Sequence, residues 1–131
     1  MAETILTREL RLRQAQLLLG ANVPQPVPDE VKWGYTGVPN PVLPTNAANI
    51  VTSLVNEVAS TNEIRPFLEG DSVAVESTLR NDQETGAITI NEVGVLSGGT
   101  LIGYAIFREV YLEPADEYTF VFNLLGSGDD A

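Results

Sequence analysis

The stretch from Ile88 to Phe107 constrains the fold more than any other part of the sequence. Two apolar runs rich in β-branched residues meet there at Ser97-Gly98-Gly99-Thr100. Paired glycines supply the positive φ angles that a two-residue hairpin turn requires. The sequence therefore predicts an antiparallel hairpin whose turn consists of Gly98 and Gly99.

The predicted hairpin is apolar on both faces, because successive side chains of a strand alternate between faces. A hairpin in a two-layer domain usually keeps one face in water. We therefore expect the second face to contact another layer or another subunit, since an exposed apolar patch normally marks an interface. The register pairs Leu96 with Leu101, Val95 with Ile102, Val93 with Tyr104 and Ile90 with Phe107. The expected interface face consists of Val93, Val95, Ile102 and Tyr104.

Length and composition indicate one soluble domain with a substantial core. The chain has 131 residues, 44% of them hydrophobic, which is ordinary for a globular protein. Its apolar runs stay below the roughly 18 residues needed to cross a bilayer, so we expect no membrane contact. Arginines interrupt the apolar start of the chain, so we expect no signal peptide and synthesis in a cytoplasm.

The net charge of −11 is unevenly distributed along the sequence. A polyanion repels nucleic acid, so we expect no nucleic-acid partner. Arg8, Arg11 and Arg13 gather near the start, whereas acidic residues dominate the remainder. This basic segment either contacts an acidic surface on a neighbouring subunit or forms a solvated helix face.

Residues 1–30 are predicted to form a helix followed by an extended arm. Apolar residues recur at near-helical spacing from Glu3 to Leu19, and Gly20 is typical of a helix end. Every second residue from Pro24 to Pro28 is proline, which favours an extended conformation suited to lying across a surface. The helix is either part of the core or a docking element.

Residues 31–131 are predicted to form a β-rich domain. Trp33 and Tyr35 would point the same way from a short strand, which makes them a candidate contact pair; burial of Trp33 in the core is the alternative. The segment Ala47–Ala59 fits either a helix or a strand. The fold expected for the whole chain is mainly β, a sandwich-like antiparallel domain with one N-terminal α-helix and a proline-rich extended arm. Further strands are expected at Glu63–Phe67, Ser72–Leu79 and Tyr118–Leu125.

The sequence contains few of the side chains that usually carry out catalysis. It contains no cysteine and no histidine, which excludes thiol nucleophiles, Cys/His zinc sites and imidazole acid–base chemistry. Glu92 is a lone carboxylate in an apolar strand, so we expect it to have a structural partner, a backbone donor or an arginine. The loop acids do not follow the calcium-loop pattern. We therefore predict a protein that is not an enzyme and has no catalytic residue, cofactor or metal.

Two segments carry a family resemblance. One is Ile90-Asn91-Glu92-Val93-Gly94-Val95-Leu96, followed by Gly98-Gly99-Thr100-Leu101-Ile102; the other is Leu54-Val55-Asn56-Glu57-Val58. Both resemble the attachment domain of contractile-phage tail-collar fibre and tail-fibre proteins. The first is similar to that family's Ile-x-Glu-Ile-Gly-Leu-Phe strand, with its glycine turn and following strand. The second is similar to the family's Leu-x-Asn-Glu-Val element. The resemblance covers about Trp33 to Leu125 and favours extended structure after Leu54.

The resemblance implies a structural virion protein of a tailed phage. It would be an adaptor at the baseplate, collar or tail-fibre junction, made in the host cytoplasm, with other virion proteins as partners. Trimeric fibres attach through trimeric domains, so the resemblance also implies a homo-oligomer, a trimer. The sequence carries no fibre shaft or receptor-binding tip, which favours a small adaptor; the alternatives are a capsid decoration protein and a glycan-binding module. The expected partner interface comprises Arg8, Arg11, Arg13, Trp33, Tyr35, Val93, Val95, Ile102 and Tyr104.

Overall fold

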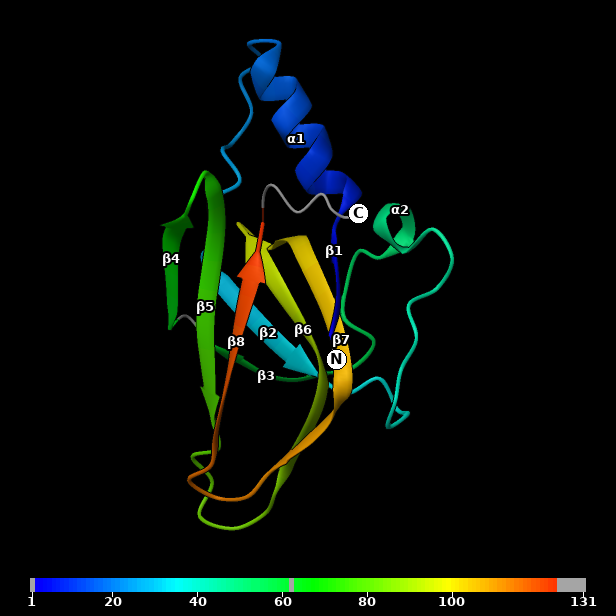
Figure 1. Ribbon diagram of the computed structural model, residues 1–131, viewed down its shortest axis with the longest axis vertical. Helices are drawn as coiled ribbons and strands as arrows, with labels where there is room; N and C mark the ends of the chain where they lie inside the picture. The colour runs from blue at the N-terminus through cyan, green and yellow to red at the C-terminus, as the bar shows by residue number, and fades with distance from the viewer. Residues whose placement is uncertain (1, 62, 125–131) are drawn as a thin grey trace.

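The computed structural model describes residues 2–61 and 63–124, which form two antiparallel β-sheets packed face to face (Figure 1). One sheet has the strand order β1-β7-β6-β2-β3 and the other the order β4-β5-β8. The prediction of a mainly β, antiparallel fold is confirmed; residues 125–131, including the acidic tail, lie outside the described residues. The elements are β1 (Glu3–Leu6), α1 (Arg8–Leu18), β2 (Glu30–Gly34), α2 (Ala47–Ile50), β3 (Glu57–Thr61), β4 (Ile64–Glu69), β5 (Ser72–Arg80), β6 (Ile88–Ser97), β7 (Thr100–Leu112) and β8 (Glu117–Asn123).

The turn between β6 and β7 is the predicted one. Gly98 and Gly99 have φ angles of 57° and 86°, and Ser97 pairs with Thr100 across the turn. Positive φ at both central residues is the requirement of the tight turns that match strand twist. The glycine pair therefore sets the position of the hairpin.

The predicted register fails beyond the first pairs of the hairpin. After Leu96 pairs with Leu101, a bulge places Val95 opposite Gly103 instead of Ile102. A second irregularity follows Ile90, which pairs with Val110 rather than Phe107. A bulge adds a residue to one strand and so changes which side chains share a face.

The face expected to be an open interface lies instead in the core between the two sheets. Val93, Val95 and Ile102 are each at most 1% exposed and pack with Val75 of β5 and Phe122 of β8. The three-stranded sheet supplies the second layer, so these side chains are not available to a partner. The predicted face of Tyr104 is also wrong. Tyr104 lies on the opposite side of the five-stranded sheet, with Leu96, Leu101 and Ile106.

The start of the chain is a strand of the sheet rather than the first turn of a helix. β1 pairs along β7, with Glu3 opposite Ile106, and α1 begins only after Thr7. The Thr7 hydroxyl donates to the Leu101 carbonyl at 2.7 Å and accepts from the Leu10 N–H as a helix cap. The expected boundary at residue 30 also falls at the first residue of β2, inside the same sheet. Residues 1–30 and 31–131 are therefore not separate units.

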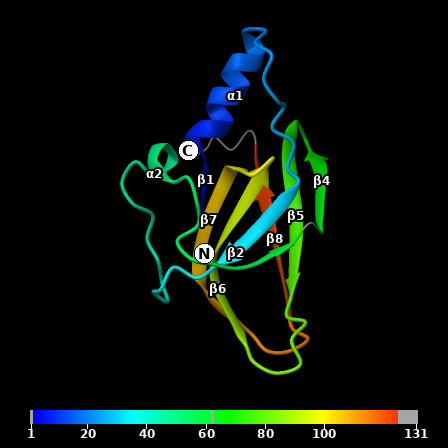
Figure 2. The same ribbon diagram turned by 180° about the vertical axis from the view of Figure 1, so that it is seen from behind.

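Residues 8–28, here called the helical arm, project from the hairpin end of the sandwich (Figures 1 and 2). At its base, Arg13 donates to the Thr100 hydroxyl at 3.1 Å. Where the chain returns, the Asp29 carboxylate accepts from the Gly98 N–H at 3.0 Å. Both ends of the helical arm are therefore tied to the β6–β7 turn.

Residues 35–56, here called the covering loop, connect β2 to β3 and include α2. The covering loop lies on the side of the five-stranded sheet away from the three-stranded sheet (Figure 1). Leu43, Val51 and Leu54 pack there against the second apolar cluster, which includes Tyr104. Extended structure after Leu54 begins at Glu57. Loops of this length are uncommon in compact domains and are usually either functional or linker segments, so the covering loop is a candidate for the functional site.

Candidate functional site

Two consecutive polar residues of β6 hold the covering loop. Strand geometry would send Asn91 and Glu92 to opposite faces, but the irregularity between Ile90 and Glu92 lets both side chains reach the loop. Asn91 is fully buried. Its side-chain amide donates to the Val38 carbonyl at 2.5 Å, and its oxygen accepts from the Thr36 N–H at 2.7 Å. The first part of the loop is thereby fixed to the sheet.

Glu92 fixes the last part of the covering loop. Its carboxylate is fully buried and accepts from the Val55 N–H at 3.0 Å, the Asn56 N–H at 2.9 Å and the Tyr104 hydroxyl at 2.5 Å. Burial, and then the hydrogen bond to Glu92, raise the pKa of Tyr104 far above its usual range. The prediction of a backbone partner for Glu92 is confirmed. A buried carboxylate with three donors is satisfied as a structural anchor.

Gly34 makes room for this anchor. A Cβ at Gly34 would overlap both the Glu92 carboxylate and the Asn56 carbonyl. The two segments on which the phage resemblance rests also meet at this point, since Val55 and Asn56 belong to one and Glu92 to the other. Val55, Asn56 and Glu92 therefore meet in one local contact.

A groove of about 290 Å3 opens between the covering loop and β7. Tyr104 and Ile106 contribute to its wall from the sheet. The loop side of the groove combines apolar residues with the hydroxyl residues Thr36, Thr52 and Ser53. Val42 and Ile50 of the loop are 83% and 56% exposed. We call it the loop groove. Sequence reasoning missed it; the signal was the long stretch of low regular structure between Gly34 and Glu57.

The predicted aromatic pair is not an exposed surface. Trp33 is fully buried and packs edge-on against Tyr118, with ring centroids 6.0 Å apart, so its alternative fate as a core residue is confirmed. Tyr35 is half-buried, and its hydroxyl donates to the Glu109 carboxylate at 2.9 Å. The prediction of Trp33 as an interface residue is therefore wrong.

The three arginines lie on α1 and not on the buried hairpin face. Arg11 donates to the Asn49 side chain at 2.7 Å and so links α1 to the covering loop. Arg13 donates a hydrogen bond to Thr100 at the start of β7, and Arg8 is exposed. The helical arm therefore carries its positive charge on the part of α1 nearest the sandwich.

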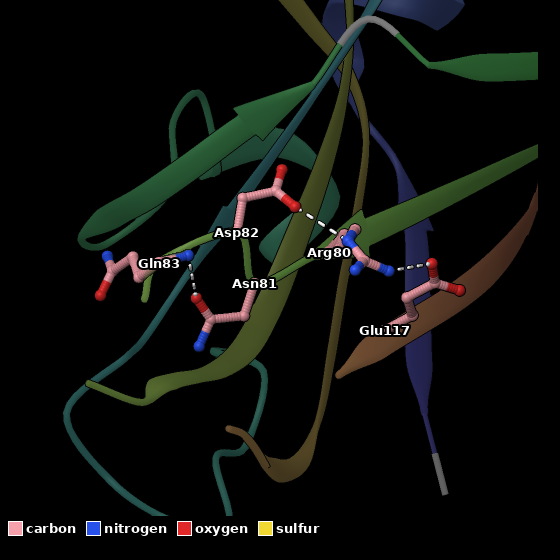
Figure 3. Close-up of polar contacts among 5 residues, drawn as sticks. All are labelled: Arg80, Asn81, Asp82, Gln83 and Glu117. Atoms are coloured by element: carbon pink, nitrogen blue, oxygen red, sulfur yellow. Dashed lines mark hydrogen bonds and ion pairs between the residues drawn. The ribbon is translucent and has the colours of Figure 1, made fainter. Parts of the chain in front are cut away.

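A second polar cluster lies at the end of the sandwich opposite α1 (Figure 3). Arg80 contacts Asp82 at 2.9 Å and Glu117 at 3.1 Å, and these hydrogen bonds, that of Glu117 foremost, raise the pKa of Arg80. Asn81 is fully buried, donates to the Leu112 carbonyl and accepts from the Gln83 N–H. The cluster joins the chain after β5 to the ends of the neighbouring strands, which is a structural role.

Within residues 2–61 and 63–124, acidic side chains do not gather in threes to form a metal site. Neither helix of that part of the chain is long and apolar enough to cross a bilayer. In comparisons with protein-family models, with curated proteins and with solved structures, the chain matches none. The loop groove, its anchor and the helical arm are the candidate binding features of the described chain.

Proposed function

We propose that this protein is a structural virion protein of a tailed phage, an adaptor at the baseplate, collar or tail-fibre junction. The observation that carries the proposal is the Glu92 anchor. It joins the two segments that resemble the fibre attachment domain and, through them, holds a long loop on a rigid sheet. Loops positioned by a rigid scaffold are the usual carriers of binding function.

An adaptor has to contact at least two neighbours, and the molecule offers two separate surfaces for them. One is the loop groove; the other is the helical arm, which projects beyond the strands (Figure 1). We include in the proposal that α1 and the proline-rich segment that follows it act as a docking arm. Prolines restrict the free chain, so less conformational entropy is lost when such a segment binds.

The proposed partners are other virion structural proteins and further copies of this chain. The protein would be made in the host cytoplasm and built into the tail, and it would act by binding rather than by catalysis. A homo-oligomer remains part of the proposal through the resemblance. The hairpin face does not support it, because Val93 and Val95 are covered by the chain itself.

Incorporation into particles tests the proposal. Phage particles would be purified from cells that produce the tagged protein, and heads and tails would then be separated. We expect the tag in the tail fraction, at a copy number that matches tail symmetry. A globular protein with the same tag, produced in the same cells, controls for carry-over.

Two other results would contradict the tail assignment. Tagged protein in the head fraction, at the copy number of the capsid lattice, would identify a capsid decoration protein. Tagged protein missing from particles, together with tight binding on a glycan array, would identify a glycan-binding module.

A further inference from the structure

We propose that the open edge of β8 binds an extended segment of a partner protein, which adds a fourth strand to the three-stranded sheet. Addition of a strand to a sheet edge is a recurring mode of peptide recognition. The inference goes beyond the proposed function, which places its partners on the loop groove and the helical arm. It depends only on the fold of this chain, so its test does not require phage particles.

The edge of β8 away from β5 carries a row of backbone groups that face outward. At one end of the β5–β8 ladder the Leu124 N–H donates to the Val73 carbonyl at 2.8 Å. At the other end the Asp116 carbonyl accepts from the first N–H after β5 at 2.9 Å. Backbone bonds to one neighbour recur at every second residue of an antiparallel strand. The even-numbered residues of β8 therefore bond to β5, and Thr119 and Val121 direct their N–H and C=O groups to the open edge.

β8 is long and unprotected for an edge strand. It spans seven residues, more than β1, β3 or β4, and its ladder with β5 has no bulge. Proteins usually protect edges with short strands, prolines, lysines or bulges, and β4, the other edge of this sheet, contains Pro66. β8 contains none of these, and its Val121 is 50% exposed. In the part of the chain that the structure describes, β5 is the only strand that pairs with β8.

The wider sheet leaves room for a fourth strand beside β8. β8 lies over β7, since Phe120 packs on Phe107 with ring centroids 5.7 Å apart and Phe122 lies against Gly103. β1 is the next strand beyond β7, whereas β5 lies on the opposite side, near β3 (Figure 1). A strand added to β8 would therefore face β1, where Leu6 is half-buried against the core. Apolar side chains on the inner face of the added strand would cover Leu6.

The fold favours a single strand of a partner over a second copy of the whole sandwich. Antiparallel pairing of two β8 edges would place both five-stranded sheets on the same side of the joined sheet. Because β1 extends past β8 in each copy, the two β1 strands would then occupy the same space. An extended segment avoids this overlap. The pattern it needs is that of β5, which meets the other edge of β8 with Val75 and Leu79 buried and with Glu76 and Thr78 on the outer face.

Fluorescence anisotropy of a labelled synthetic peptide, Ser72–Arg80, tests strand addition to the full chain. The peptide should follow the pairing of β5, with Thr78 opposite Thr119 and Glu76 opposite Val121. We expect binding at micromolar concentration, with slower hydrogen exchange at the Thr119 and Val121 amides of the protein. N-methylation at Glu76 and Thr78 removes the N–H groups directed at β8 and should weaken binding by roughly tenfold or more.

The matched control is the same peptide N-methylated at Val75 and Ser77, whose N–H groups would point away from β8. This peptide should bind like the unmodified one. In the protein, Val121→Pro removes an edge N–H and should weaken binding by roughly tenfold, whereas Val121→Thr keeps that N–H and should bind like the wild type. Proline is tolerated where the N–H of an edge strand faces solvent, so Val121→Pro should keep the circular dichroism spectrum of the wild type.

Three results would overturn the inference. They are no binding of the unmodified peptide, equal binding of the two methylated peptides, and protection from exchange confined to amides outside β8. Self-association of the wild-type chain that Val121→Pro abolishes would assign the edge to a second copy, and would overturn the inference as well. A chain that enters phage tails but does not bind the peptide would overturn the inference and leave the proposed function standing.

Discussion

Tyr104 of β7 donates a hydrogen bond to Glu92 of β6 with the two oxygens 2.5 Å apart, and both side chains are buried. The same carboxylate accepts the backbone N–H groups of Val55 and Asn56. Two neighbouring strands thus fix the end of a loop that has little regular structure of its own. The shape of the loop groove depends on this contact, because Tyr104 and Val55 both line it.

We expect Glu92→Gln to destabilise the protein by about 3 kcal/mol, because a glutamine offers one acceptor oxygen and an NH2 group that would face a donor. Urea denaturation followed by tryptophan fluorescence measures this change. Glu84→Gln, at an exposed acid, is the control and should change stability by less than about 0.5 kcal/mol. Equal urea midpoints for Glu92→Gln and the wild type would contradict the anchoring role.

Tyr104→Phe should remove part of the dependence of stability on alkaline pH. The pKa of Tyr104 is raised in the folded protein, so the unfolded chain ionises first as pH passes about 10. The stability gained from neutral Tyr104 is therefore complete below about pH 10 and is lost as pH rises beyond it. Tyr104→Phe should be less stable near neutrality by about 1–2 kcal/mol.

Urea midpoints measured from about pH 8 to about pH 11 compare the two proteins across the window in which unfolded tyrosine ionises. The curve of Tyr104→Phe should fall less steeply than that of the wild type. Tyr35 and Tyr118, whose pKa values are also raised, remain in both proteins and do not affect the difference. Parallel curves would show that Tyr104 is accessible and unpaired.

Gly34→Ala should cost about 2–3 kcal/mol, because its Cβ would overlap the Glu92 carboxylate and the Asn56 carbonyl between two paired strands. Gly99→Ala is the matched control. Gly99 has a φ of 86° and open space around a Cβ, so its cost is limited to backbone strain of about 1 kcal/mol. Hydrogen exchange should show faster exchange at Val55 and Asn56 in Gly34→Ala only. Similar exchange rates at Val55 and Asn56 in both variants would show that Gly34 does not lie against the Glu92 contact that holds the covering loop.

Removal of residues 1–30 should lower the thermal unfolding midpoint. The deletion takes away β1 and the Thr7 hydrogen bond, and it leaves the edge of β7 unpaired. A sequence-based view of this segment as a detachable arm predicts unchanged folding instead. Circular dichroism melts decide between the two, and a midpoint equal to that of the full chain would support detachment.

The parts of the fold that were predictable depend on local chemistry. The Gly98–Gly99 turn follows from the φ angles that only glycine adopts easily. The need of Glu92 for a partner follows from the cost of burying a carboxylate. Neither conclusion requires knowledge of distant segments.

The parts that were missed depend on long-range packing. The covering of Val93 and Val95 by β5 and β8 involves strands that lie far along the chain, so the hairpin alone looked open. Ile5 and Leu6 fit both a helix stripe and an edge strand, and pairing with β7 selected the strand. The bulge near Ile102 moved Tyr104 to the other face, and alternation alone contains no sign of it.

The most direct test of the central proposal is a cryo-electron microscopy reconstruction of phage particles that carry the protein. We predict density for the two-sheet sandwich in the tail, at the baseplate, the collar or the base of a fibre, with the covering loop or the helical arm against a neighbouring chain. Density on the capsid lattice, or its absence from complete particles, would contradict the adaptor role.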